Sequence, residues 1–150
     1  MYKRQLATAA RGTLKLHSDD SGTTAVTELP VCPMPAWYFD VYASQLGEIL
    51  VLDDDEEITS KIASVLPDAV LRSYMDEEPF LRTARAEPGA FLFVDYGFAG
   101  RRTGLELIKS EELADRAVLF TGRGHFDTEI QKAAMMAGVR ILPKECVVRR

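Results

Sequence analysis

The sequence contains few cysteines, and the two that are present, Cys32 and Cys146, lie far apart. So small a number excludes a disulfide framework, and the spacing matches no structural zinc site. Apolar runs long enough to cross a membrane are also lacking, and the N-terminus has no apolar core of the signal-peptide type. We therefore expect reduced thiols, a cytoplasmic location and no membrane contact by this segment.

Positive charge is scarce as well. Lysine and arginine together number 18, against 23 aspartates and glutamates, and the formal net charge is −5. This deficit argues against nucleic acid as the main partner, because binding to phosphates requires concentrated basic surface. Two short basic spots, Arg101-Arg102 and Arg149-Arg150, are interpreted as solvated surface. The length of 150 residues suits one domain of ordinary size with a short appendage.

Residues 1–46 differ in pattern from the rest of the chain. Residues 1–5 are predicted to be a non-native leader, so the natural protein is expected to begin further upstream. Apolar and polar side chains alternate over 12–18, and turn-forming residues at 19–22 separate this strand pattern from a returning strand at 23–29. A lone hairpin is marginally stable in water, so we expect it to need a larger body to pack on.

A segment at 31–46, rich in proline and aromatic residues, follows the hairpin. Pro30, Pro33 and Pro35 predict a stiff, extended linker. An aromatic cluster comes next and consists of Trp37, Tyr38, Phe39 and Tyr42. Because so much aromatic surface is unfavourable in water, we expect the cluster to dock onto the domain that follows.

Strand and helix patterns alternate from Gly47 onward. Short apolar runs predict strands near 48–53, 69–74, 90–95, 116–121 and 139–142. Helical spacing of apolar residues predicts helices near 55–66, 77–86, 104–112 and 127–137. Asp55 is predicted to be the N-cap of the first helix. Repetition of this kind gives an α/β fold, in which helices cover both faces of a parallel sheet.

Polar side chains follow four of these strands, at the point where each strand ends. Asp53 and Asp54 follow the first strand, and Asp95 ends the third. Thr121 ends the fourth strand, and Lys144 follows the fifth. Because parallel strands carry their carboxyl ends to one edge of a sheet, we expect these side chains to lie together. Carboxylates gathered at that edge form a site for a divalent cation and a phosphoryl group.

Four motifs resemble the receiver domain of two-component response regulators. They are EILVLDDDEEI, FLFVDYGFAGRRTGLELI, AVLFTG and GVRILPKE, in the order and at the spacing of that family. The resemblance covers about 47–150. It implies a doubly wound, five-stranded parallel sheet of order 2-1-3-4-5, the CheY-like flavodoxin arrangement, with the active site at the switch point.

The resemblance also implies roles for individual residues. Asp95 corresponds to the phosphoacceptor, whose carboxylate attacks a phosphohistidine and becomes an acyl phosphate. Thr121 and Lys144 correspond to the residues that contact phosphoryl oxygens during in-line transfer. A Mg²⁺ cofactor is implied, bound directly by Asp54 and through water by Asp53, with Asp95 and the carbonyl of Gly97 completing the protein ligands.

The sequence departs from the family pattern near its C-terminus. Lys144 is followed by Glu145, where proline and a cis peptide bond are usual. Ile141 stands where most members carry the tyrosine or phenylalanine that reports phosphorylation. Only six residues follow Lys144, so the last helix is expected to be truncated or missing. One flank of the sheet would then be exposed, or would be left for the aromatic cluster that begins at Trp37 to cover.

The segment 6–30 resembles the closing hairpin of a histidine-kinase ATPase domain, through the run ARGTLKLHSDDSGTTAVTELP. This implies a receiver at the end of a hybrid histidine kinase, acting in a phosphorelay with a histidine kinase domain or a histidine phosphotransfer protein as partner. The chain lacks ATP-binding motifs, so no independent activity is expected beyond self-phosphorylation and dephosphorylation. One alternative is an unphosphorylated pseudo-receiver that acts as a regulatory protein-interaction module. Another, an aspartate-nucleophile phosphatase, is disfavoured because Gly97 stands where a general acid is needed.

Overall fold

The computed structural model describes residues 11–31, 33–41, 46–122 and 127–148. The chain divides into two compact units, Met1–Met34 and Pro35–Arg150. Among the described residues, no helix is both long enough and apolar enough to cross a membrane.

The first unit contains a β-hairpin. Strand β1 (Thr13–Asp19) pairs antiparallel with β2 (Gly22–Glu28), as the alternating pattern predicts. The turn is closed by Asp19, whose Oδ1 accepts hydrogen bonds from the amide and the hydroxyl of Ser21 at 2.8 and 2.5 Å. Gly22 completes the turn with a φ of 141°, a backbone conformation that residues other than glycine rarely adopt. The side chains of both strands are almost entirely exposed.

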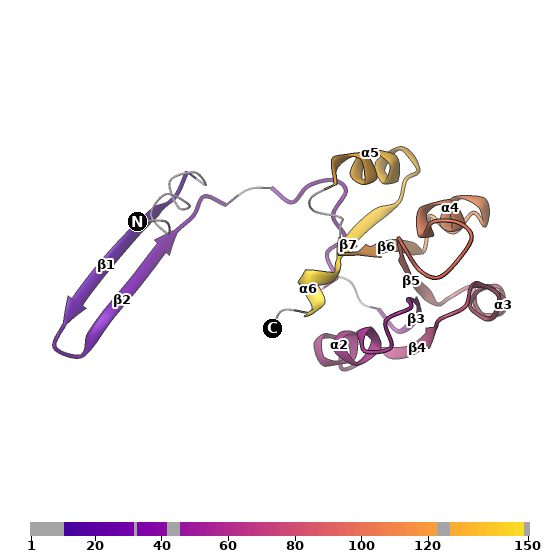
Figure 1. Cartoon of the computed structure of the whole chain (residues 1–150), viewed down its shortest axis with the longest axis horizontal. Helices are drawn as coiled ribbons and strands as arrows, with labels where there is room; N and C mark the ends of the chain where they lie inside the picture. Colours follow the sequence, from indigo (N-terminus) through magenta and orange to yellow (C-terminus); the bar gives the residue numbers. More distant parts are fainter. Residues whose placement is uncertain (1–10, 32, 42–45, 123–126, 149–150) are drawn as a thin grey trace. The chain divides into compact units, whose positions relative to one another are not determined.

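The second unit is built on a five-stranded parallel sheet (Figure 1). Its strands are β3 (Glu48–Leu52), β4 (Val70–Tyr74), β5 (Phe91–Asp95), β6 (Ala117–Thr121) and β7 (Arg140–Pro143). Their spatial order is β4-β3-β5-β6-β7, which is 2-1-3-4-5 when the strands of this sheet are counted along the chain. The predicted fold class and strand order are therefore confirmed.

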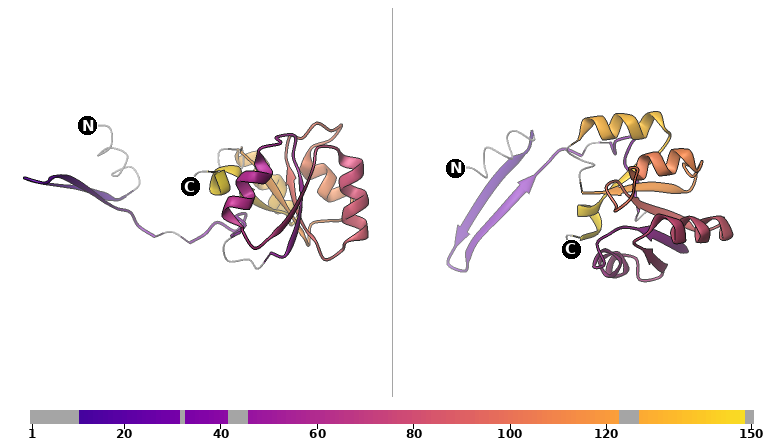
Figure 2. Two further views of the ribbon diagram at one scale, coloured as in Figure 1. Left: turned by 90° about the horizontal axis from the view of Figure 1, so that it is seen from below. Right: turned by 45° about the vertical axis from the view of Figure 1, so that its right-hand side comes forward.

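Helices cover both faces of the sheet (Figure 2). Helices α3 (Glu77–Ala86), α4 (Gly104–Ser110) and α5 (Thr128–Met136) pack on one face, and α2 (Ile58–Val65) and α6 (Lys144–Val148) lie on the other. Side chains alternate between the faces along each strand: Leu50 and Leu52 enter one core, while Ile49 and Val51 enter the other. All four are fully buried, as is typical of a parallel sheet with two covered faces.

The start of α2 differs from the prediction. The N-cap is Glu57 rather than Asp55, and the helix begins at Ile58. The Asp55 carboxylate instead accepts a hydrogen bond from the Glu57 amide at 3.0 Å, and the Asp55 carbonyl accepts one from the Ile58 amide at 3.1 Å. An aspartate that hydrogen-bonds the amide two residues on stabilises a turn, and this turn delays the helix.

The outer edge of β7 is paired with a segment from the predicted linker. The Phe39 amide donates to the Ile141 carbonyl at 2.8 Å, and the Ile141 amide donates to the Trp37 carbonyl at 2.7 Å. Tyr38 thereby forms a parallel bridge with Ile141, beside the edge strand. Phe39 and Val41 are 1% and 0% exposed, and both belong to the core on the face of α2 and α6.

Aromatic contacts hold this segment, residues 37–41, against the sheet. The Phe39 ring stacks on Phe91 with centroids 5.2 Å apart, and the Arg140 guanidinium lies 4.7 Å from the Phe39 centroid. The expected docking of the aromatic cluster is confirmed for Trp37 and Phe39, whereas Tyr42 lies outside the described residues. Helix α6 contributes Val147 to the same core cluster as Phe39 and Val41 of this segment.

Candidate functional site

Strand register brings the predicted acidic residues together. Leu52 of β3 is aligned with Val94 of β5, so Asp53 and Asp95, the next residue of each chain segment, reach the same edge. Ligand oxygens of Asp53, Asp54 and Asp95 all lie within 4.8 Å of one another. Asp53 and Asp95 are buried, at 3% and 8% exposure, while Asp54 is exposed.

Asp95 is held by its own loop. Its Oδ2 atom accepts a hydrogen bond from the Gly97 amide at 2.9 Å. The loop closes where the Gly104 amide donates to the Tyr96 carbonyl at 3.0 Å. A Cβ atom on Gly104 would lie 2.0 Å from the Asp95 carbonyl oxygen, so only glycine permits this close approach of α4 to the end of β5.

Lys144 lies between two of the carboxylates. Its Nζ atom is 2.6 Å from Asp53 Oδ2 and 3.1 Å from Asp95 Oδ1. Register explains this position, because Thr121 at the end of β6 pairs with Pro143, the residue just before Lys144. The lysine side chain is 21% exposed, so its ammonium is partly withdrawn from water while it neutralises the acids.

Burial and charge shift the pKa values within this group. Burial raises the pKa of the Asp53 carboxyl, and contacts with Lys144 and with the Asp55 amide offset that effect only in part. Burial by itself would lower the pKa of Lys144, but its contacts with Asp53 and Asp95 outweigh burial and raise it. Lys144 therefore neutralises Asp53 and Asp95 in part and makes no contact with Asp54, so three carboxyl groups and one ammonium carry a formal net charge of −2.

The excess charge and the oxygen donors fit a divalent metal ion. Ligand oxygens around Mg²⁺, at bonds of ~2.1 Å, lie roughly 3–4 Å apart, close to the separation of these three carboxylates. Asp54 has no hydrogen bond or ion pair with any residue in the described ranges, so its oxygens are available as ligands. The acidic cluster is thus consistent with divalent metal binding.

The remaining predicted residues lie at the same edge. Thr121 ends β6 one position beyond Phe120, which is paired with Asp95, and its side chain is 3% exposed. Gly97 is exposed next to the carboxylates, and the structure gives its amide, rather than its carbonyl, a defined contact with Asp95. Gly122 is partly buried, and a Cβ atom there would meet Glu145 at an ordinary 3.6 Å.

Two contributions to the site were not predicted. One is the direct contact between Lys144 and Asp53, which joins residues that are ninety-one positions apart. The other is the close approach of Gly104 to Asp95. The sequence did contain a signal for the position of Gly104, because Thr103 and Glu106 form a capping box that fixes where α4 begins.

Neither protein-family models nor curated protein sequences match this chain. Solved structures do match its second unit. CheY4 of Vibrio cholerae superposes with a TM-score of 0.55 at 15% identity, over 70% of this chain and 95% of that protein. A CheY-like receiver domain from Methylobacillus flagellatus gives 0.53 at 18% identity, over 67% and 87%. The second unit has the fold of a CheY-like receiver domain.

We call Pro35–Arg150 the receiver unit from here on. A response regulator from Burkholderia pseudomallei also matches it, with a TM-score of 0.52 at 28% identity, over 65% of this chain and 59% of that protein. The structure of that regulator contains a phosphorylated aspartic acid, a calcium ion and citrate.

Proposed function

We propose that the receiver unit accepts a phosphoryl group on Asp95 in a two-component phosphorelay, with Mg²⁺ as cofactor. The observation that carries this proposal is the convergence of three carboxylates and Lys144 at one edge of the sheet. Oxygens of the three carboxylates lie within 4.8 Å of one another, and Lys144 Nζ lies 3.1 Å from Asp95 Oδ1. The phosphorylated aspartate and the calcium ion of the Burkholderia regulator support it, because both occur on the same fold.

In the proposed reaction an oxygen of the Asp95 carboxylate attacks the phosphorus of a phosphohistidine. A new O–P bond forms while the P–N bond breaks, and the electron pair leaves with the imidazole nitrogen. The Gly97 amide and Lys144 hold the two Asp95 oxygens in fixed directions before attack. The Lys144 ammonium also offers a positive charge to the phosphoryl oxygens, and the Thr121 hydroxyl offers a hydrogen bond.

Mg²⁺ would be held by Asp53, Asp54, Asp95 and the Gly97 carbonyl. When bound, it would neutralise charge on the acids and on the incoming phosphoryl group. Without it the excess negative charge of the acidic cluster repels a phosphate donor, so phosphorylation is expected to depend on the metal.

The proposed donors are a histidine kinase domain or a histidine phosphotransfer protein, and the proposed location is cytoplasmic. We further propose that residues 1–5 are a non-native leader, that 6–30 are the closing hairpin of a histidine-kinase ATPase domain, and that the parent protein is a hybrid kinase. The exposure of Leu16 and Val26, at 64% and 40%, is in keeping with a hairpin that belongs to a larger domain.

Acetyl phosphate tests the proposal without any partner protein. The full chain, incubated with acetyl phosphate and Mg²⁺, is expected to gain the mass of one phosphoryl group, and Asp95→Asn is expected to gain none. Asp54→Asn should react at least about tenfold more slowly, because it removes a metal ligand. Asp76→Asn is the matched control: this acid also follows a strand but makes no side-chain cap, so the variant should react like the wild type.

The outcome that contradicts the proposal is an unlabelled wild type, or a mass gain that survives Asp95→Asn. An unlabelled wild type would favour the pseudo-receiver, in which the same fold acts as a protein-interaction module. Ile141 is the observation behind that alternative, because this fully buried residue stands where the family carries its reporting aromatic side chain.

A further inference from the structure

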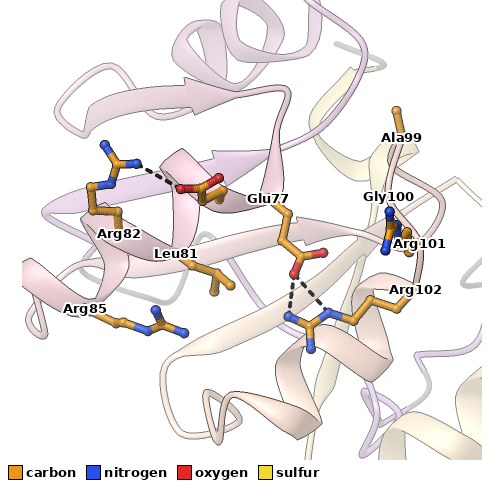
Figure 3. A pocket seen from close by; sticks show the side chains of 9 residues that line it. Glu77, Leu81, Arg82, Arg85, Ala99, Gly100, Arg101 and Arg102 are labelled. Carbon is orange, nitrogen blue, oxygen red and sulfur yellow. Dashed lines mark hydrogen bonds and ion pairs between the residues drawn. The ribbon is translucent and has the colours of Figure 1, made fainter.

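A pocket lined by four arginines lies near the edge of the sheet that carries Asp95. Its volume is about 990 Å³, and its walls are one side of α3, from Glu77 to Arg85, and the loop after β5, from Ala99 to Arg102 (Figure 3). Helix α3 follows the carboxyl end of β4, and the loop follows that of β5, so both walls start from the same edge. Arg82 and Arg85 lie on the helix wall, with Arg101 and Arg102 on the loop wall.

Arg102 is a structural residue of this pocket. Its guanidinium binds Glu77 of α3 and Glu111, with distances of 2.5 and 3.0 Å from Nη2, and its side chain is only 26% exposed. The interpretation of Arg101-Arg102 as plain solvated surface is therefore wrong for Arg102, which ties the loop to α3. Because both of its carboxylate partners are partly buried, it is not available to a ligand.

Arg82 and Arg101 are available to a ligand, whereas Arg85 shares the carboxylate of Glu111 with Arg102 and must release it to bind one. Arg82 is 76% exposed and pairs with Glu78 one turn earlier, an exposed pair of the kind that contributes little to stability. Arg85 is 67% exposed and contacts Glu111 at 2.6 Å. Arg101 is exposed and forms no ion pair or hydrogen bond with any residue that the structure describes.

The pocket is a positive spot on an acidic molecule. Its four arginines face Glu77 and Glu78 in the lining and Glu111 beside it, a surplus of one positive charge, whereas the whole chain carries a net charge of −5. Local charge of opposite sign to the surroundings steers charged partners and fixes their orientation. Guanidinium groups, which bind carboxylates through two parallel hydrogen bonds, are well suited to such a role.

We propose that this arginine pocket binds an acidic segment of a partner protein. The available guanidinium groups lie on opposite walls (Figure 3), which suits a row of carboxylates better than a single phosphate. The nine lining residues, all described, include no aromatic side chain on which a nucleotide base could stack. That the partner is the phosphoryl donor rests on the proposed function; the binding itself does not.

Fluorescence anisotropy of a fluorescein-labelled peptide of about ten aspartates and glutamates tests the binding, with the full chain at low salt. Replacing Arg82, Arg85 and Arg101 together by Gln is expected to weaken binding about tenfold or more. Arg101→Gln, which disturbs no contact of the described residues, should weaken it about threefold and guards against misfolding of the triple variant. The matched control replaces Lys61, Lys109 and Lys132 by Gln, which removes the same charge outside the pocket and should change affinity less than about twofold.

Three outcomes would overturn the proposal: no peptide binding by the wild type, equal weakening in the pocket and control variants, or binding of inorganic tripolyphosphate but not of the peptide. The last would assign the pocket to a small polyanion. Labelling with acetyl phosphate separates this proposal from the previous one. The triple arginine variant should be labelled like the wild type; an unlabelled wild type that still binds the peptide would defeat only the phosphoacceptor role of Asp95.

Discussion

The hairpin and the receiver unit contain strands of similar regularity, but they bury very different amounts of side chain. In the receiver unit Ile49 through Leu52 are fully buried, because helices cover both faces of the sheet. In the hairpin the best-covered residue is Leu14, and even it is only partly buried. An alternating or apolar pattern therefore predicts that a strand forms, while its burial depends on what packs against it.

The largest expected effect on the free energy of unfolding comes from a residue of the predicted linker, which follows the hairpin. Phe39 lies in the predicted linker, yet it is buried in the core of the receiver unit. Phe39→Ala is expected to lower the free energy of unfolding by about 3–5 kcal/mol, as for other large aromatic side chains removed from a core. Urea unfolding of the full chain measures this change. Val31→Ala, at a 99% exposed position of the same linker, is the control and should have no measurable effect.

Gly104 tests how closely the elements of the receiver unit pack. Gly104→Ala would put a methyl group against the Asp95 carbonyl, so α4 must shift, at a cost of about 1–3 kcal/mol. The shift should also slow labelling of Asp95 by acetyl phosphate. Gly89→Ala is the matched control, because a Cβ atom there meets no other atom within 4 Å. Equal stability of the two variants would show that the approach of α4 is not tight.

Glu111 tests how much the ion pairs on the surface of the receiver unit contribute to its stability. Hydrogen bonds from Arg85 and then Arg102 hold the pKa of Glu111 below its ordinary value of 4.5. A lowered carboxyl pKa stabilises the fold above the ordinary pKa, and that contribution disappears as the pH falls below it. Glu111→Gln should therefore cost about 0.5–1 kcal/mol near pH 7, and the difference should shrink towards about pH 3. Glu56→Gln, at an exposed position, is the control and should change the free energy of unfolding near pH 7 by less than about 0.5 kcal/mol.

The smallest effect is expected in the hairpin itself. Leu16 is 64% exposed on β1, so Leu16→Ser should change the free energy of unfolding by no more than about 0.5 kcal/mol. Chemical denaturation followed by circular dichroism gives the comparison with the wild type. A loss above about 1 kcal/mol would mean that another surface covers this side chain, and the contrast between the two regions would then fail.

The sheet could be predicted because its strands are short apolar runs that end in polar residues. Each predicted strand agrees with the structure to within about one residue at either end; for example, 90–95 corresponds to Phe91–Asp95. The first helix was predicted too long, since the turn made by Asp55 depends on a side-chain hydrogen bond that periodicity does not report. The linker was assigned from its prolines, but the pairing of Phe39 with Ile141 depends on the position of β7 in the folded sheet.

The candidate site, like the fold, could be predicted only as far as the positions of the strand ends. Strand ends were enough to gather Asp53, Asp95 and Lys144, because parallel strands share one carboxyl edge. Contacts between distant segments were not predictable, and the clearest case is Arg102, whose partners Glu77 and Glu111 come from two other parts of the chain. Side-chain pairs of this kind depend on how the helices and loops settle on the sheet.

The bridge between Tyr38 and Ile141 has a consequence for solubility. An edge strand with unpaired amides and carbonyls can recruit a strand from another molecule and so begin aggregation. Residues 37–39 occupy those groups of Ile141, so the chain blocks one rim of its own sheet. A shortened protein that began at Gly47 would uncover this rim together with the Phe39 binding surface, and we expect it to self-associate where the full chain does not.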